Sequence, residues 1–200
     1  MRTAINDVIY RYWPTVIIVL SIVIILRVTS LIKSGRKSFV LYEEIYNLFF
    51  IAYLLILFNL VTNQDMATVG GTNFVPFKEI MRYDFGSSGF YKQVIGNILL
   101  FIPLGYFATG YCKLKKIGGI LIVSLLSSTT IEVVQHFIGR SFDVDDIILN
   151  VVGGIIGFLI YIGINAIKNR LPRFMRKKWF YNLLCLLVIV AIIFYLFKVL

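Results

Sequence analysis

Residues 131–157 read IEVVQHFIGRSFDVDDIILNVVGGIIG and set ionisable side chains between apolar runs long enough to cross a membrane. Such groups are costly inside hydrocarbon, so they indicate a functional site. After residue 142, one helix face would carry polar and small residues at steps of three and four: Asp143, Asp146, Asn150, Gly153 and Gly157. A second stripe has similar spacing: Ser124, Ser128, Glu132 and Gln135. A short turn at 139–141 would fold the two helices back so that the stripes face each other.

The rest of the composition predicts an all-α polytopic membrane bundle. Hydrophobic residues make up 59% of the 200-residue chain and charged residues only 15%. A hydrocarbon core of ~30 Å needs about 20 apolar residues per helix. Six segments come close to that length: 14–32, 44–62, 94–111, 117–138, 147–167 and 179–198. We therefore expect about six transmembrane helices in a single membrane domain, residues 1–200.

The basic residues predict an orientation in a bacterial cytoplasmic membrane. Twelve Lys and Arg residues follow the first, third and fifth segments, whereas seven lie on the other side. Cytoplasmic loops are the basic ones, so the termini and the loops 63–93 and 139–146 are expected outside. The net charge of +10 follows the segments and does not indicate nucleic-acid binding. Residues 168–200 add a basic, aromatic loop suited to anionic lipids and an extra C-terminal helix.

The loop at 63–93 is unusually apolar. After Pro76, the spacing of Phe77, Ile80 and Met81 predicts a short amphipathic helix at the outer membrane surface. Two roles stay open for this segment, an aromatic anchor in the membrane interface or a cover over a ligand.

Proline and glycine positions predict how the helices pack. Pro103 should kink the segment 94–111, and Gly105 should let a neighbour approach closely. Gly153 and Gly157 form a small-x-x-x-small pattern, which we expect to contact the segment 117–138.

Polar residues of several segments converge at one depth, roughly 5 to 9 Å from the outer helix ends at 1.5 Å per residue. This layer predicts an outward-facing polar pocket formed by the second to fifth segments. Asn59 also approaches this layer. The expected ligand-binding residues are Asn73, Asn97, Glu132, Gln135, Arg140, Asp143, Asp146 and Asn150. The alternative is a structural network, in which Asp143 or Asp145 only caps a helix and Arg140 only neutralises the carboxylates.

Four motifs in this order resemble the VanZ-like family of bacterial membrane proteins. They are Asn73-Phe-Val-Pro-Phe77, Asn97-x-x-x-Phe-x-Pro-x-Gly105, Glu132-x-x-Gln135 and Arg140-x-x-Asp-x-x-Asp-x-x-x-Asn-x-x-Gly153. The resemblance covers about residues 44–165. It implies low-level teicoplanin resistance without altered peptidoglycan precursors.

The leading functional hypothesis is a non-enzymatic envelope protein whose pocket binds membrane lipid, a lipoglycopeptide or a lipid-linked envelope precursor. The alternative is a membrane enzyme acting on lipid-linked substrates, with Glu132 and Asp146 as acid and base. In that case Asp143 and Asp146 would be the carboxylates to hold Mg²⁺, although no cofactor is expected. A lipid transporter is a third hypothesis, disfavoured by the small size and the absence of repeats.

Overall fold

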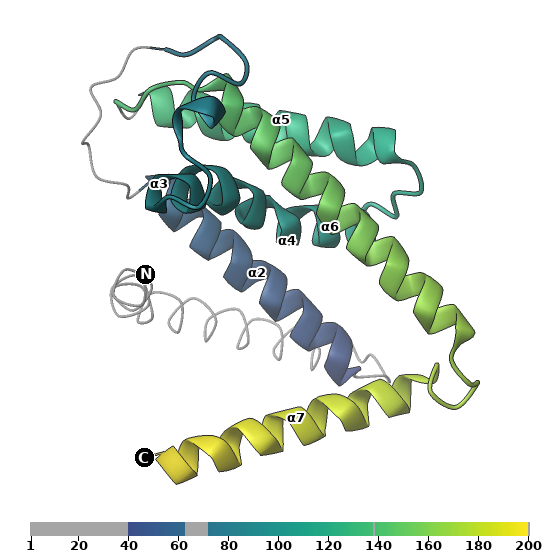
Figure 1. The fold of residues 1–200 in the computed structure, drawn as a ribbon. Helices are drawn as coiled ribbons and strands as arrows, with labels where there is room; N and C mark the ends of the chain where they lie inside the picture. Colours follow the sequence, from purple (N-terminus) through teal and green to yellow (C-terminus); the bar gives the residue numbers. More distant parts are fainter. Residues whose placement is uncertain (1–39, 63–71, 138, 200) are drawn as a thin grey trace. The chain divides into compact units, whose positions relative to one another are not determined.

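The computed structural model describes residues 40–62, 72–137 and 139–199, and its regular elements are helices. Figure 1 shows the long helices α2 (Leu41–Thr62), α4 (Gly96–Tyr111), α5 (Ile117–Phe137), α6 (Val144–Arg170) and α7 (Lys178–Val199). Three short turns precede α4: the 3₁₀ turn η1 (Ile80–Arg82), α3 (Ser88–Phe90) and the π-helical turn η2 (Tyr91–Ile95). The expected first segment, 14–32, lies outside the described residues.

Four helical stretches of the described chain are long and apolar enough to cross a membrane. They are Leu41–Val61, Phe90–Tyr111, Ile117–Phe137 and Val144–Arg170. They confirm the second to fifth predicted segments and an all-α, multi-pass membrane protein. The sixth predicted segment is α7, whose described apolar part, Lys178–Ile192, is shorter than the other four.

The helices fall into two compact units, divided near residues 56 and 168. In the first unit, the start of α2 is tied to α7. The backbone N–H of Tyr42 donates to Asn182 Oδ1 at 3.2 Å, and Lys178 Nζ lies 2.9 Å from Glu43 Oε1. The second unit, residues 57–167, contains α4, α5 and most of α6, and it carries the candidate site.

Glycines bring the backbones of α4 and α6 into direct contact. A Cβ atom on Gly153 would overlap the carbonyl oxygen of Ile98, and one on Gly157 would overlap that of Ile102. On the α4 side, Gly105 is equally close to the backbone of Gly154. The predicted close approach at Gly105 is therefore present. The expected partner of Gly153 and Gly157 was wrong, because these glycines face α4 and not α5.

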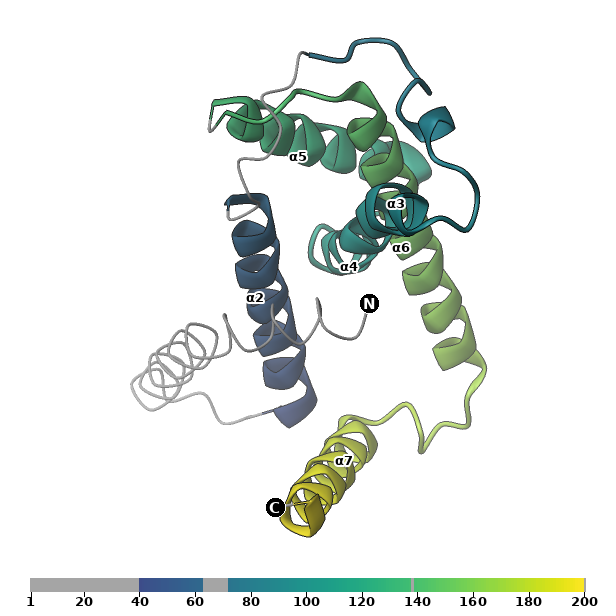
Figure 2. The same ribbon diagram turned by 60° about the vertical axis from the view of Figure 1, so that its left-hand side comes forward.

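Helix α5 packs on a different side of α6 through small and polar residues. The Cβ position of Gly154 falls against the side chain of Ser124, and Asn150 Nδ2 donates to Ser128 Oγ at 2.9 Å. Ser124 and Ser128 are fully buried. Since α4 and α5 contact different positions of α6, the three helices form a bundle, visible from two sides in Figure 1 and Figure 2.

A tight turn joins α5 to α6 and starts α6 with acidic residues. Gly139 has a φ of 92°, a conformation that suits glycine, and the N–H of Arg140 donates to the carbonyl of Gln135 at 2.9 Å. Asp143 Oδ1 then accepts the N–H of Asp145 at 2.9 Å and thereby caps α6. The capping role that the sequence suggested for Asp143 is therefore real.

Residues 73–85, called the docked segment below, are held against the start of α6 by backbone hydrogen bonds. Asn73 donates its N–H to the carbonyl of Phe142 at 2.8 Å and accepts from the N–H of Val144 at 3.1 Å. The carboxylate of Asp145 accepts three backbone N–H groups, from Phe77 at 2.5 Å, Glu79 at 2.7 Å and Ile80 at 3.2 Å. Asp145 is only 1% exposed, so these bonds compensate a buried carboxylate.

This docking replaces the amphipathic helix predicted after Pro76. Phe77 has a φ of 67°, outside the helical region, and only the three residues of η1 form a helical turn there. The N–H groups that a helix would leave unpaired in its first turn are bound instead by Asp145. The apolar side chains of the segment nevertheless lie on the surface. Those exposed are Phe74, Val75, Phe77, Met81 and Phe85.

Substitution of Gly157 by Leu should disrupt the α4–α6 contact. The new side chain would collide with the Ile102 carbonyl, which cannot move without shifting α4. We expect a lower yield of monodisperse protein in detergent and a lower Tm. Gly163→Leu, on the same helix with no atom within 4 Å of its Cβ position, is the matched control. An unchanged Tm for Gly157→Leu would contradict this packing.

Substitution of Asp145 by Asn should release the docked segment while the helices stay folded. The amide offers one oxygen, no charge and an N–H₂ group to the three N–H donors, and a hydrogen bond to a charged group contributes about 1.5 to 3 kcal/mol. We expect hydrogen exchange at Phe77, Glu79 and Ile80 to accelerate roughly tenfold to a hundredfold. Asp84→Asn, an exposed acid of the same segment, should leave this exchange unchanged. Equal protection in both variants would show that Asp145 does not hold the segment.

Candidate functional site

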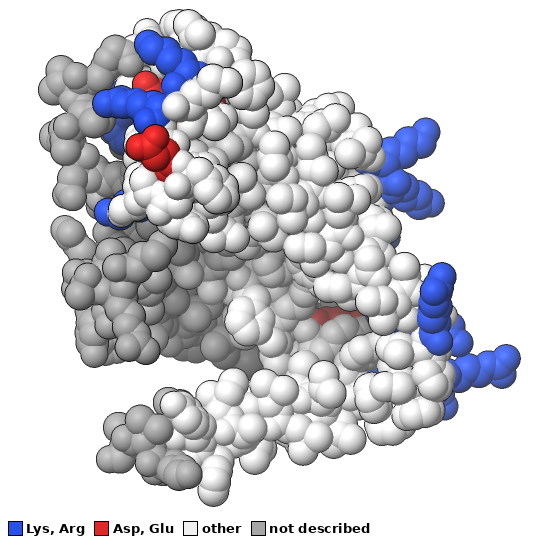
Figure 3. Space-filling view, in the orientation of Figure 1, with Lys and Arg blue, Asp and Glu red and all other residues white. Residues whose placement is uncertain are grey.

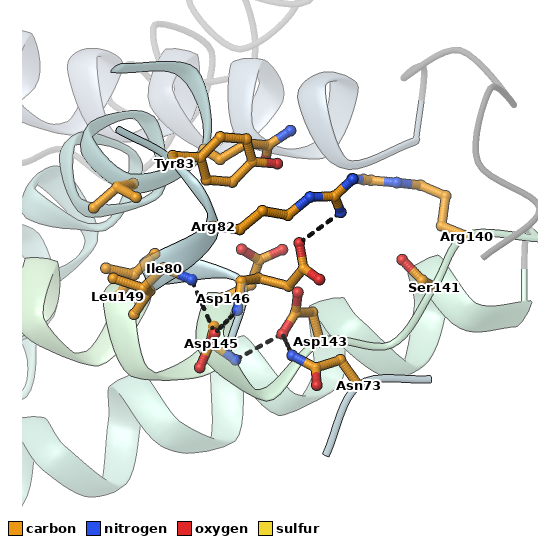
Figure 4. A pocket seen from close by; sticks show the side chains of 13 residues that line it. Asn73, Ile80, Arg82, Tyr83, Arg140, Ser141, Asp143, Asp145, Asp146 and Leu149 are labelled. Atoms are coloured by element: carbon orange, nitrogen blue, oxygen red, sulfur yellow. Dashed lines mark hydrogen bonds and ion pairs between the residues drawn. The ribbon is translucent and has the colours of Figure 1, made fainter. Parts of the chain in front are cut away.

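A cavity of about 310 Å³ lies where the docked segment covers the start of α6. Its wall combines charged, polar and a few apolar side chains (Figure 4). They are Asn73, Glu79, Ile80, Arg82, Tyr83, Gln93, Val94, Arg140, Ser141, Asp143, Asp145, Asp146 and Leu149. They come from the docked segment, from η2, and from the α5–α6 turn with the first two turns of α6. A cavity of this size suits a small ligand or the head group of a larger one.

The π-helical turn η2 supplies one side of the cavity. An extra residue per turn displaces the side chains of an α-helix, and such turns occur frequently at functional sites. Here Gln93 and Val94 reach the cavity from η2, and neither was among the expected site residues.

Two further carboxylates, those of Glu132 and Asp146, lie at the ends of α5 and α6 that are nearest the cavity. Glu132 of α5 is 2% exposed, and its Oε2 accepts the N–H of Asp143 at 3.0 Å. With the amide orientation that satisfies both neighbours, Gln135 donates to Glu132 Oε1 at 3.0 Å. Asp146 lines the cavity, and its Oδ1 accepts a hydrogen bond from Asn97 of α4. The acids thereby connect α4, α5 and α6 at one end of the bundle.

The acidic residues of the cavity wall are all engaged by donors. Asp143 Oδ1 accepts from Asn73 Nδ2 at 2.9 Å, Asp145 holds the docked segment, and Glu79 Oε2 accepts from Arg82 Nη1 at 3.1 Å. Asn73 Oδ1 in turn accepts the N–H of Val75 at 3.2 Å. These contacts fix the shape of the wall before any ligand arrives, which is the arrangement expected of a preorganised site.

Arg140 differs from the acids because it makes no ion pair with a carboxylate of the described residues. Its guanidinium donates to the amide oxygen of Gln135, a neutral acceptor. No Asp or Glu oxygen of the described residues lies within the 4.0 Å of an ion pair with it. Glu132 and Asp146 do lie within the electrostatic reach of Arg140. Its side chain is half-buried and lines the cavity.

The eight expected ligand-binding residues fall into three hydrogen-bonded groups, and only half of them line the cavity. Asn73, Asp143, Glu132, Gln135 and Arg140 form one group, Asn97 bonds to Asp146, and Asn150 bonds to Ser128. Asn73, Arg140, Asp143 and Asp146 are in the wall. Asn97, Glu132, Gln135 and Asn150 lie behind it and contact the wall or neighbouring helices. Whether any of them binds a ligand stays a prediction.

The helices around the cavity differ from those expected. In the described part of the chain, the wall includes no residue of α2 or α5, although the second to fifth predicted segments were expected to form it. Helix α5 contributes from behind, through Glu132 and Gln135.

Several wall residues were missed because their signal lies in tertiary contacts. Arg82, Tyr83 and Glu79 reach the site only because Asp145 folds the segment over α6. The sequence suggested Asp145 only as a helix cap. The motif Asn73 to Phe77, which includes Pro76, was the available signal that this segment is specifically shaped.

The positions of the acidic side chains bear on the Mg²⁺ site that the sequence suggested. Within residues 40–62, 72–137 and 139–199, no group of three or more His, Cys, Asp or Glu side chains is arranged to hold a metal ion. Asp143 and Asp146, the carboxylates considered for Mg²⁺, have Asn73 and Asn97 as partners.

Comparison with known proteins finds a distant relative. The protein "Protein VanZ" of Enterococcus faecium is 33% identical over 82 residues, which are 38% of this chain and 48% of that protein. The chain therefore spans about half the length of this relative. No solved structure matches the chain.

The family described as VanZ/LLP1 matches residues 45–168. This range begins in α2 and ends in α6, so it includes the docked segment, the glycine contact and every residue of the cavity wall. A match over more than half of the chain, to the part that forms the site, shows that this membrane protein belongs to the VanZ/LLP1 family.

Proposed function

We propose that this protein resides in a bacterial cytoplasmic membrane and lowers susceptibility to glycopeptides such as teicoplanin by binding a ligand in the cavity. The observation that carries the proposal is the preformed charged cavity at one end of three packed helices. Buried carboxylates cost stability in such a place, and packing alone could be achieved with apolar residues. The resemblance to the VanZ-like family and the relative named "Protein VanZ" support the resistance role.

The surroundings of the cavity suit an amphiphilic ligand. The docked segment that supplies part of the polar wall also carries exposed apolar side chains, with Met81 81% and Phe85 90% exposed. An apolar rim of this kind marks contact with membrane or with an acyl chain. A lipoglycopeptide combines a fatty chain with a charged sugar-peptide head, so rim and wall could hold its two parts.

The outer side of the membrane is the proposed location of the cavity. The turn between α4 and α5 lies at the opposite end of these helices and carries Lys113, Lys115 and Lys116. Figure 3 shows basic side chains over the α4–α5 turn, away from the mixed charges at the cavity end. The more basic end belongs in the cytoplasm.

The enzyme alternative has less support. A general acid or base must come within hydrogen-bond reach of the substrate. Glu132 does not line the cavity, is nearly inaccessible, and uses its oxygens to accept from Asp143 and Gln135. Asp146 alone of the proposed pair faces the cavity.

Thiol labelling in intact cells tests the orientation. Cys112 is exposed at the end of α4 opposite the cavity, and Cys185→Ser would leave it as the single thiol of the chain. A membrane-impermeant maleimide should label Cys112 only after the cells are broken. A second variant, Ser88→Cys with both native cysteines replaced by serine, should be labelled in intact cells because Ser88 is exposed at the cavity end. The reverse labelling pattern would place the cavity in the cytoplasm.

Charge removal in the network tests the ligand-binding role. Asp146→Asn preserves shape and should nevertheless return teicoplanin tolerance of a susceptible host to the empty-vector level. Glu132→Gln and Arg140→Ala should do the same, with double variants no worse, because Glu132, Gln135 and Arg140 belong to one hydrogen-bonded group and loss of a member leaves its partners unsatisfied. Asp84→Asn is the control for an exposed acid of the same segment. Full tolerance with Asp146→Asn at normal protein levels would make the network purely structural.

A further inference from the structure

We infer that the cavity binds the phosphate of a lipid head group between Arg82 and Arg140. This inference rests on the proposed function of the cavity as a ligand site and names the chemistry of its ligand. Figure 4 shows the two side chains entering from different parts of the chain, with their guanidinium groups pointing toward one another. Both line the cavity, Arg82 from η1 and Arg140 from the α5–α6 turn.

Two cationic groups directed at each other repel unless an anion lies between them. The described residues supply little negative charge to pair with these two groups. Arg82 is 69% exposed and pairs with Glu79, a surface contact that contributes little. Arg140 has a neutral amide acceptor and no carboxylate of the described residues in ion-pair range. The position facing both guanidinium groups is therefore electrostatically suited to an oxyanion.

The other acids of the wall do not fill this position, because each is held by other donors. Asp143 is bound by Asn73 and the N–H of Asp145, Asp145 by three backbone amides, and Asp146 by Asn97. Their hydrogen bonds keep these carboxylates with the helix ends and the docked segment, which leaves the arginine side of the cavity to the ligand.

The location identifies the oxyanion as a phosphate carried by a lipid. Guanidinium groups bind phosphate through paired N–H groups, and two of them can engage its free oxygens together. The cavity lies at the end of membrane-spanning helices, and the docked segment that forms part of its wall also carries the exposed side chains of Phe77, Met81 and Phe85. At the boundary of a bilayer the abundant oxyanion is lipid phosphate, and its acyl chains could contact this apolar rim.

The test is a binding comparison with the full chain purified in a neutral maltoside detergent. Dioctanoyl phosphatidylglycerol, dioctanoylglycerol and glycerol 3-phosphate share parts of one structure, and only the first has both phosphate and chains. Native mass spectrometry and the ligand-induced rise in Tm report binding. We expect phosphatidylglycerol to bind and to raise the Tm, and the other two compounds to bind at least about tenfold more weakly.

The same binding measurement on arginine variants is the second part of the test. Arg82→Gln and Arg140→Gln should each weaken phosphatidylglycerol binding by about tenfold or more, as the loss of a hydrogen bond to a charged group predicts. Lys115→Gln, which removes an exposed charge at the far end of the helices, should leave binding unchanged. Since Arg82 is exposed and outside the helix contacts, its variant should fold normally and keep the test decisive if Arg140→Gln does not.

Three results would overturn the inference. If dioctanoylglycerol binds as tightly as phosphatidylglycerol, the phosphate is not recognised. If glycerol 3-phosphate binds as tightly, the acyl chains are not needed. If Lys115→Gln weakens binding as much as the arginine variants do, the effect comes from net charge alone. Failure of the inference is distinguishable from failure of the proposed function. If the protein binds the three compounds equally and still confers teicoplanin tolerance, only the lipid-phosphate assignment is wrong. If it binds phosphatidylglycerol selectively but confers no tolerance, the assignment is supported and the resistance role is wrong.

Discussion

The buried carboxylate of Asp145 is the interaction on which the site depends. It lies in the first turn of α6 and collects the N–H groups of Phe77, Glu79 and Ile80, so one side chain decides the path of a segment nearly seventy residues earlier in the chain. An unpaired carboxylate there would be far too costly, and unpaired amides would be costly as well. Each side therefore requires the other, and the cavity wall is a result of this mutual requirement.

The remaining acids extend the same principle between helices. Glu132 receives the N–H of Asp143, Asp143 receives the side chain of Asn73, and Asp146 receives that of Asn97. Buried charged groups contribute little net stability compared with apolar packing, but removal of one partner is costly. The network accordingly defines which helix ends meet, while apolar and glycine contacts such as those of Phe101 and Gly157 supply the close packing.

Much of this could be predicted from the sequence, and the failures have identifiable causes. Hydropathy and the spacing of Asp143, Asp146 and Asn150 predicted the second to fifth helices and the convergence of the polar residues. A small-x-x-x-small pattern predicts a close contact but not its partner, so Gly153 and Gly157 were assigned to the wrong helix. The amphipathic spacing after Pro76 was misleading because Phe77 leaves helical geometry to meet Asp145. Arg82 carried no local signal, since only the docking brings it to the cavity.

The glycine contact between α4 and α6 also fixes how far one helix can shift along the axis of the other. Ile98 and Ile102 place their carbonyl oxygens against Gly153 and Gly157, one helical turn apart on each helix. A slide along the helix axis by a fraction of a turn would move these oxygens off the glycines and toward positions of α6 that carry side chains, so the two helices have one axial register. Asn97 comes one residue before Ile98 and Asp146 seven residues before Gly153, so the hydrogen bond between their side chains lies on the cavity side of the glycine contact. A backbone contact that contains no charged group thus holds together the two helices whose polar side chains meet beside the cavity.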